Sequence, residues 1–200
     1  MPKVILGVCV CLLGAFACGG GESAESDSGA SMTSSDAAAA INLDESACDA
    51  SDLVIVEVVA DDHITLFNPT SAAIDVANYR WCQRPNYDSL STAGGDSSAA
   101  PGASVSFNWP EGFSLSGDRG ELALYNSSSF GDGSSIVDYL CWGEFSGGRM
   151  SEAESGGHWL GSCSSAAPSG ETTLRRVMES SGKSQISYAW GSTTPAISCM

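Results

Sequence analysis

Residues 53–67 read LVIVEVVADDHITLF, and this stretch indicates the fold. Residues 53–59 are apolar at nearly every position and rich in β-branched side chains, which is typical of a well-buried strand. The pair Asp61-Asp62 is a turn signal, residues 63–67 then alternate apolar and polar side chains, and Asn68-Pro69 ends the run. The stretch therefore predicts a β-hairpin.

The rest of the chain continues this pattern of short runs. Apolar residues make up 42% of the 200 residues and charged residues only 16%, against about 25% in a typical globular domain. No segment keeps a 3.6-residue period over a helical length. Further strands are predicted over 77–83, 105–109, 121–125, 136–142, 172–177 and 185–190, and loops over 88–103, 127–135 and 143–170. Short strands separated by turns predict an all-β, immunoglobulin-like antiparallel β-sandwich.

The first residues are predicted to be a targeting signal. Residues 1–17, MPKVILGVCVCLLGAFA, are typical of a secretory signal peptide, since one Lys precedes an apolar run that is too short to span a membrane. Ala17, Cys18 and the glycines that follow resemble the lipobox of bacterial lipoproteins, which implies lipid attachment at Cys18. The alternative is an ordinary signal peptide cut near Ala17. Gly19, rather than an Asp, follows Cys18, which resembles the pattern of outer-membrane sorting in enteric bacteria. We therefore expect a membrane-anchored lipoprotein of the bacterial cell envelope, in the outer membrane.

Residues 18–51 are predicted to be a disordered, acidic tether rich in Gly, Ser and Ala, ahead of a domain at 52–200. Residues 19–52 hold eight acidic residues and no basic one, with too few large apolar side chains to form a core. The tether spaces the domain from the lipid surface, or alternatively binds a partner through its charge. The whole chain has 24 acidic and 8 basic residues, a net charge of −16. Nucleic-acid binding is excluded because it needs clustered Lys and Arg.

The order of motifs in the domain resembles that of the lamin-tail domain, an immunoglobulin-like β-sandwich. The motifs that carry this resemblance are Val56-Glu57-Val58, ITLFNP at 64–69, PEGFSL at 110–115, VDYLCWG at 137–143, TLRR at 173–176 and the closing segment 190–195. The resemblance implies a non-enzymatic binding, adhesion or attachment module for an unknown protein or polysaccharide. It brings no ligand residues that are shared across the family.

Catalytic, metal and cofactor sites are not predicted. His63 and His158 are the only histidines, and no G-x-S-x-G nucleophile elbow occurs. The acidic turns lack the D-x-D-x-D-G pattern of a calcium loop, and no C-x-x-C motif lies outside the signal segment. These absences favour a binding protein over an enzyme.

Five tryptophans raise an alternative function. Alternation along the predicted strands places Trp81 and Trp142 in the core, whereas Trp109 precedes a proline and Trp159 lies in a Gly/Ser-rich loop. Trp109 and Trp159 are therefore the candidates for stacking on a ligand. Exposed aromatic rings on a β-sandwich would suit a carbohydrate-binding or hydrolase-accessory protein.

Five cysteines, Cys48, Cys82, Cys141, Cys163 and Cys199, follow Cys18. Export to an oxidising compartment favours disulfides, and an odd number leaves one thiol over. Several connectivities remain open. We expect Cys48 to pair with Cys199, because domain termini often lie close together, and Cys82 to pair with Cys141 on neighbouring strands, which leaves Cys163 free. The alternative is five reduced cysteines.

Overall fold

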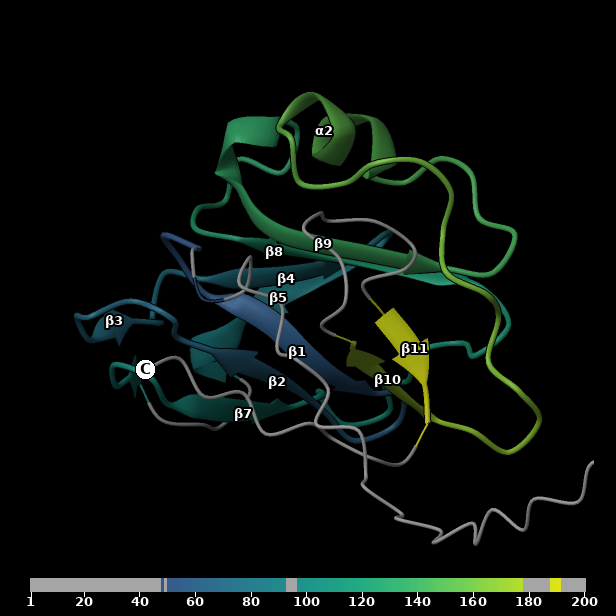
Figure 1. The fold of residues 1–200 in the computed structure, drawn as a ribbon, viewed down its shortest axis with the longest axis horizontal. Coiled ribbons are helices and arrows are strands. Elements are labelled where there is room, and N and C mark those ends of the chain that lie inside the picture. The colour runs from purple at the N-terminus through teal and green to yellow at the C-terminus, as the bar shows by residue number, and fades with distance from the viewer. Residues whose placement is uncertain (1–47, 49, 93–96, 178–187, 192–200) are drawn as a thin grey trace, which may run out of the picture. The chain divides into compact units, whose positions relative to one another are not determined.

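The structure is a computed structural model that describes residues 48, 50–92, 97–177 and 188–191. Nearly all regular structure in these ranges is β-strand, arranged mainly in two antiparallel sheets (Figure 1). The predicted all-β antiparallel sandwich is therefore confirmed. The predicted signal peptide at 1–17, the lipid attachment at Cys18 and most of the predicted tether lie outside the described residues.

The first sheet is built on the predicted hairpin. Its strand order is β11-β10-β1-β2-β7, and its strands are β1 Val54–Val59, β2 His63–Phe67, β7 Ser104–Asn108, β10 Thr173–Arg176 and β11 Tyr188–Trp190. In β7 the side chains of Val105 and Phe107 are buried, and the residues between and beside them are exposed. One face of this edge strand therefore packs on the core, and the other faces solvent.

The second sheet is buried on both faces at its centre. Its strand order is β5-β4-β8-β9, and its strands are β4 Arg80–Gln83, β5 Asn86–Ser89, β8 Gly120–Tyr125 and β9 Ile136–Trp142. Every residue of β8 and β9 is buried. One face of these strands packs against the first sheet, and the helix α2, Met150–Ser155, lies over the other face (Figure 1). A small third sheet pairs β3, Ile74–Asp75, with β6, Ser98–Ala99.

Four short elements occupy stretches predicted as loops. The helix α2 lies within 143–170, β6 lies within 88–103 together with the 3₁₀ turn η1, Leu90–Thr92, and a second 3₁₀ turn, η2, Gly133–Ser135, ends the loop 127–135. Such pieces are too short for a period to show in the sequence, and tertiary contacts hold them. In α2, for example, only Ala153 is buried.

Candidate binding cleft

A cleft opens where the edge of the second sheet meets the segment after β7. Its volume is about 350 Å³, and its lining residues are Trp81, Pro85, Asn86, Tyr87, Asp88, Pro110 and Phe113. Residues 85–88 come from the β4–β5 hairpin, and Pro110 and Phe113 come from the turn that follows β7. Rings and prolines form the apolar part of the lining, and Asn86 and Asp88 add polar groups.

The aromatic wall of the cleft is fixed by packing in the core. The Phe113 ring lies 4.7 Å from the Trp81 ring and 5.5 Å from the Trp109 ring, measured between centroids. The turn that carries Phe113 is closed by a hydrogen bond from Phe113 N to Pro110 O at 3.0 Å, and Leu115 N donates to Ala60 O at 2.7 Å. These contacts tie the turn to the first sheet and make the wall rigid.

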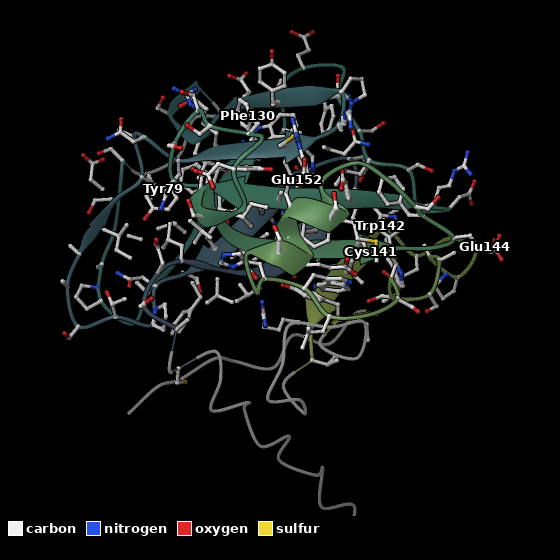
Figure 2. The ribbon with its side chains drawn as sticks, turned by 90° about the horizontal axis from the view of Figure 1, so that it is seen from above. Tyr79, Phe130, Cys141, Trp142, Glu144 and Glu152 are labelled. Carbon is white, nitrogen blue, oxygen red and sulfur yellow. A yellow bond between two sulfur atoms is a disulfide. The ribbon has the colours of Figure 1, made fainter. Side chains whose placement is uncertain are left out.

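Polar groups of the cleft remain available to a ligand. The buried Trp81 indole Nε1–H has no hydrogen-bond acceptor in the described part of the chain. Asp88 Oδ1 accepts from Ser89 N at 2.7 Å, and Asn86 Nδ2 donates to Gln83 Oε1 at 3.1 Å. Tyr87 is 62% exposed, and its ring packs at 4.8 Å from the Phe130 ring, which Figure 2 labels. The Trp81 Nε1 atom is itself buried, so Asn86 and Asp88 are the polar side chains that line the cleft.

The predicted stacking residues do not form this site, and that prediction is wrong. Trp109 is only 8% exposed, and its Nε1 donates to Val59 O at 2.7 Å. Trp159 is 0% exposed and packs edge-on against Tyr139 with 5.5 Å between centroids. Both rings fill the core, because the segments after β7 and α2 fold back onto the sheets. Tyr87 is the exposed aromatic instead, and its place in a strand beside a Pro-Asn turn is the signal that could have indicated it.

The predicted pairing of Cys82 with Cys141 is also wrong. Cys141 forms a disulfide with Cys163, with 4.9 Å between Cα atoms, and Cys82 is a buried free thiol. Strand β8 lies between β4 and β9, so Cys82 and Cys141 are separated by two strand spacings, about 9.6 Å, beyond the limit of about 7 Å for a disulfide. Burial raises the pKa of the Cys82 thiol, which keeps it protonated.

Cys163 reaches Cys141 because its segment runs along the free edge of β9. Ser164 N donates to Cys141 O at 2.9 Å, and Gly143 N donates to Ser164 O at 2.7 Å. The bridge lies at the end of β9 where Figure 2 labels Cys141 and Trp142. Cys48 is also disulfide-bonded, and Cys199 lies outside the described residues, so the pairing of Cys48 with Cys199 stays a prediction.

The two histidines sit in different surroundings. His63 Nδ1 lies 2.9 Å from Asp62 Oδ2, and His63 Nε2 lies 3.1 Å from Glu57 Oε1, so carboxylates occupy both ring nitrogens. Glu57 also pairs with Arg175 at 2.6 Å, and these partners lower the pKa of its carboxyl against the opposing effect of burial. His158 lines a second hollow of about 330 Å³ near the start of β1.

The described residues contain no cluster of three or more His, Cys, Asp or Glu side chains that could hold a metal ion. Within the same part of the chain, no helix has the length and apolar character needed to cross a membrane.

A buried ion pair joins the two sheets on the side away from the cleft. Arg176 Nη2 donates to Asp138 Oδ2 at 2.8 Å and lies 2.7 Å from the Tyr188 hydroxyl. Asp138 Oδ2 also accepts from Ile55 N at 2.8 Å, and Arg176 Nε donates to Ile55 O at 3.1 Å. Burial alone would lower the pKa of Arg176, but Tyr188 and Asp138 beside it raise this pKa above its ordinary value. Each charge is compensated, as burial requires.

A second buried carboxylate lies under the loop that leads into α2. Glu121 is 0% exposed, and its Oε2 accepts from Tyr139 Oη at 2.9 Å and from Arg149 N at 2.7 Å. Gly148 has a φ of +64°, and a Cβ there would collide with the carboxylate, so only glycine lets the loop approach. Burial raises the pKa of the Glu121 carboxyl, although both hydrogen bonds act in the opposite direction.

Comparisons with protein-family models, with curated proteins and with solved structures found no match. The resemblance to the lamin-tail domain therefore stays a prediction, and the function is inferred from the chain's own residues.

Proposed function

We propose that the protein is a non-enzymatic surface lipoprotein, anchored in the bacterial cell envelope through Cys18, whose lamin-tail-like sandwich is a binding or attachment module. The apolar segment at 1–17 and the small residue before Cys18 support the anchor. Triacylation of the new N-terminus would anchor the chain stably, because one acyl chain alone gives only marginal membrane binding.

The cleft is the observation that carries the binding role. It combines a rigid aromatic wall with a few polar groups, which is the usual composition of a ligand site. The side chains of Asn86 and Asp88 lie on the same face of the hairpin as Trp81 and supply the polar groups. The Tyr87 backbone borders the cleft, and its ring lies on the opposite face of β5, against Phe130.

A carbohydrate-binding or hydrolase-accessory role is the second candidate. Aromatic rings beside an amide and a carboxylate, here Asn86 and Asp88, are groups that stack on a sugar ring and bond its hydroxyls. The ring that would do so is that of Phe113 rather than the buried rings of Trp109 and Trp159.

The anchor is tested by metabolic labelling. The full chain, expressed in a bacterial host, should incorporate a fatty-acid probe, and Cys18→Ala should not. Cys82→Ala is the matched control, since it removes a buried thiol of the sandwich and should leave labelling unchanged. Equal labelling of the native chain and of Cys18→Ala would contradict the lipoprotein assignment.

The binding role is tested by presenting the full chain, in detergent micelles, to one array of synthetic peptides and one of oligosaccharides. Asp88→Ala should weaken the strongest interactions, because the Asp88 side chain lines the cleft. Asp118→Ala should not, because Asp118 is an exposed carboxylate that does not line the cleft. Binding that is insensitive to Asp88→Ala would contradict a ligand in the cleft.

A further inference from the structure

The backbone of β5 offers free hydrogen-bonding groups beside the cleft. Asn86 faces Gln83 across a two-residue turn, and Asp88 faces Trp81. Further along, Leu90 N donates to Tyr79 O at 2.9 Å. These alternate residues turn their N–H and C=O groups toward β4, so the intervening Tyr87 turns its own groups outward. No strand in the described part of the chain pairs with β5 on that side.

The open stretch of this edge is short and well defined. Ser89 N is already bonded to the Asp88 carboxylate, and the Arg84-Pro85 turn ends the strand on the other side. The N–H and C=O of Tyr87 are therefore the pair that an added strand would use. Two backbone hydrogen bonds give little affinity by themselves, so side chains that enter the cleft must supply the rest.

The charge around the cleft favours a ligand with a positive charge. Asp88 lines the cleft, and its second carboxylate oxygen has no hydrogen-bond partner in the described residues. Glu111 is exposed next to Pro110. Arg84, the basic residue beside Pro85, donates a hydrogen bond to Gly148 O at 3.5 Å. The chain as a whole has a net charge of −16, which would attract a cation and repel an acidic segment.

We propose that the cleft binds an extended segment of a partner protein that carries a lysine or arginine. The backbone of the segment adds to β5 at Tyr87, and its basic side chain enters the cleft and reaches Asp88. This assignment rests on the proposed binding function and names the class of ligand for the same cleft. A peptide fits better than a sugar because Tyr87 presents a strand edge, which only another backbone can match.

The test uses the full chain in detergent micelles and fluorescein-labelled octapeptides of Thr and Val in fluorescence anisotropy. One peptide has a central Lys, and a second has Glu at that position. Two further Lys peptides are N-methylated at alternate residues, so that each has the backbone N–H groups of one of its two edges blocked. The Lys peptide should bind at least about tenfold more tightly than the Glu peptide. Methylation of the pairing edge should weaken binding about tenfold, the effect of losing about 1.4 kcal/mol.

Two variants separate the contributions. Asp88→Asn keeps an oxygen for Ser89 N and removes the charge, so it should bring the Lys and Glu peptides to within about twofold of each other. Tyr87→Pro removes the outward N–H that an added strand would use, at an edge position where proline is tolerated, so it should weaken the Lys peptide while the thermal midpoint stays close to that of the native chain. Tyr87→Ala is the control, because it keeps this N–H and removes only a ring on the opposite face of β5, and it should bind like the native chain.

Several results would overturn the inference. They are equal affinity for the Lys and Glu peptides, full binding of both methylated peptides, or no peptide binding up to about 1 mM, a Kd that corresponds to about −4.1 kcal/mol. Oligosaccharides that bind in an Asp88-dependent manner would refute the peptide and leave the proposed binding function standing. If neither peptides nor oligosaccharides respond to Asp88→Ala, the binding function of the cleft fails as well.

Discussion

The two lateral sides of the sandwich differ in how they are closed. On the side of β9 and β10, the buried Asp138–Arg176 pair joins the sheets, Trp142 packs edge-on against Trp190 at 6.1 Å, and the Cys141–Cys163 disulfide lies at the end of β9. On the side of β5 and β7, the Trp81 ring packs edge-on against Trp109 and at a tilt against Phe113, and a cleft remains.

This difference predicts that the closed side contributes mainly to the stability of the fold and the open side mainly to ligand binding. The closed side pairs its buried charges, so removing one partner should destabilise the fold strongly. The open side leaves an indole N–H without an acceptor and a strand edge without a neighbour in the described residues. Substitutions there should affect a ligand more than the fold.

The largest effect is expected from Asp138→Ala. The substitution leaves the Arg176 charge buried without its partner, and we expect a loss of about 3–5 kcal/mol in the free energy of unfolding. Denaturant unfolding followed by tryptophan fluorescence measures it. Asp118→Ala, at an exposed carboxylate, is the control and should change stability by less than about 0.5 kcal/mol. A loss below about 1 kcal/mol for Asp138→Ala would contradict a structural role for the pair.

Removal of the disulfide should have the next largest effect. The bond spans a sequence separation of 22 residues, for which loop-closure entropy gives about 3 kcal/mol. The double variant Cys141→Ser/Cys163→Ser should unfold at a correspondingly lower denaturant concentration. The thermal midpoint of the native chain should also fall in a reducing agent, and by more than that of the double variant, which keeps the disulfide at Cys48. A native chain with the same midpoint in both conditions would show that the bridge does not stabilise the closed side.

A smaller effect is expected at Glu121. Its pKa is raised in the folded state by burial, so its contribution to stability is fully present below the unfolded-state pKa and is lost as pH rises through the folded-state pKa. Glu121→Gln can still accept from Tyr139 and Arg149. The stability of the variant minus that of the native chain should therefore rise with pH above about 4.5. Denaturant titrations of both proteins across this range measure the difference, and a constant difference would be inconsistent with the raised pKa.

The smallest effect on stability is expected in the cleft. Tyr87→Ala removes an exposed ring whose contact is with Phe130, so the free energy of unfolding should change by less than about 0.5 kcal/mol. Calorimetry checks this. A larger loss would mean that Tyr87 closes the open side as part of the core, and the two sides would no longer differ in kind.

The sequence predicts those parts of the fold that depend on local pattern. Residues 53–67 form the expected hairpin, and 136–142 form β9 with the predicted bounds, because apolar and β-branched runs of this length have few alternatives to a buried strand. The helix α2 escapes prediction because six residues are too few to show a period.

The candidate site depends on contacts that local pattern does not contain. The disulfide depends on strand order, which places β8 between Cys82 and Cys141. The burial of Trp109 and Trp159 depends on loops that fold back over the sheets. The cleft itself joins a hairpin turn to a segment more than twenty residues away, so only the assembled sandwich reveals it.

Amide hydrogen exchange shows directly which side of the sandwich binds a ligand. The full chain in detergent micelles is compared with and without a saturating concentration of the Lys octapeptide. The difference between the sides predicts slower exchange in β5, around Tyr87, and in the turn that carries Phe113, with unchanged exchange in β9 and β10. Slower exchange confined to β9 and β10, or no change anywhere, would contradict the assignment of the open side as the binding side.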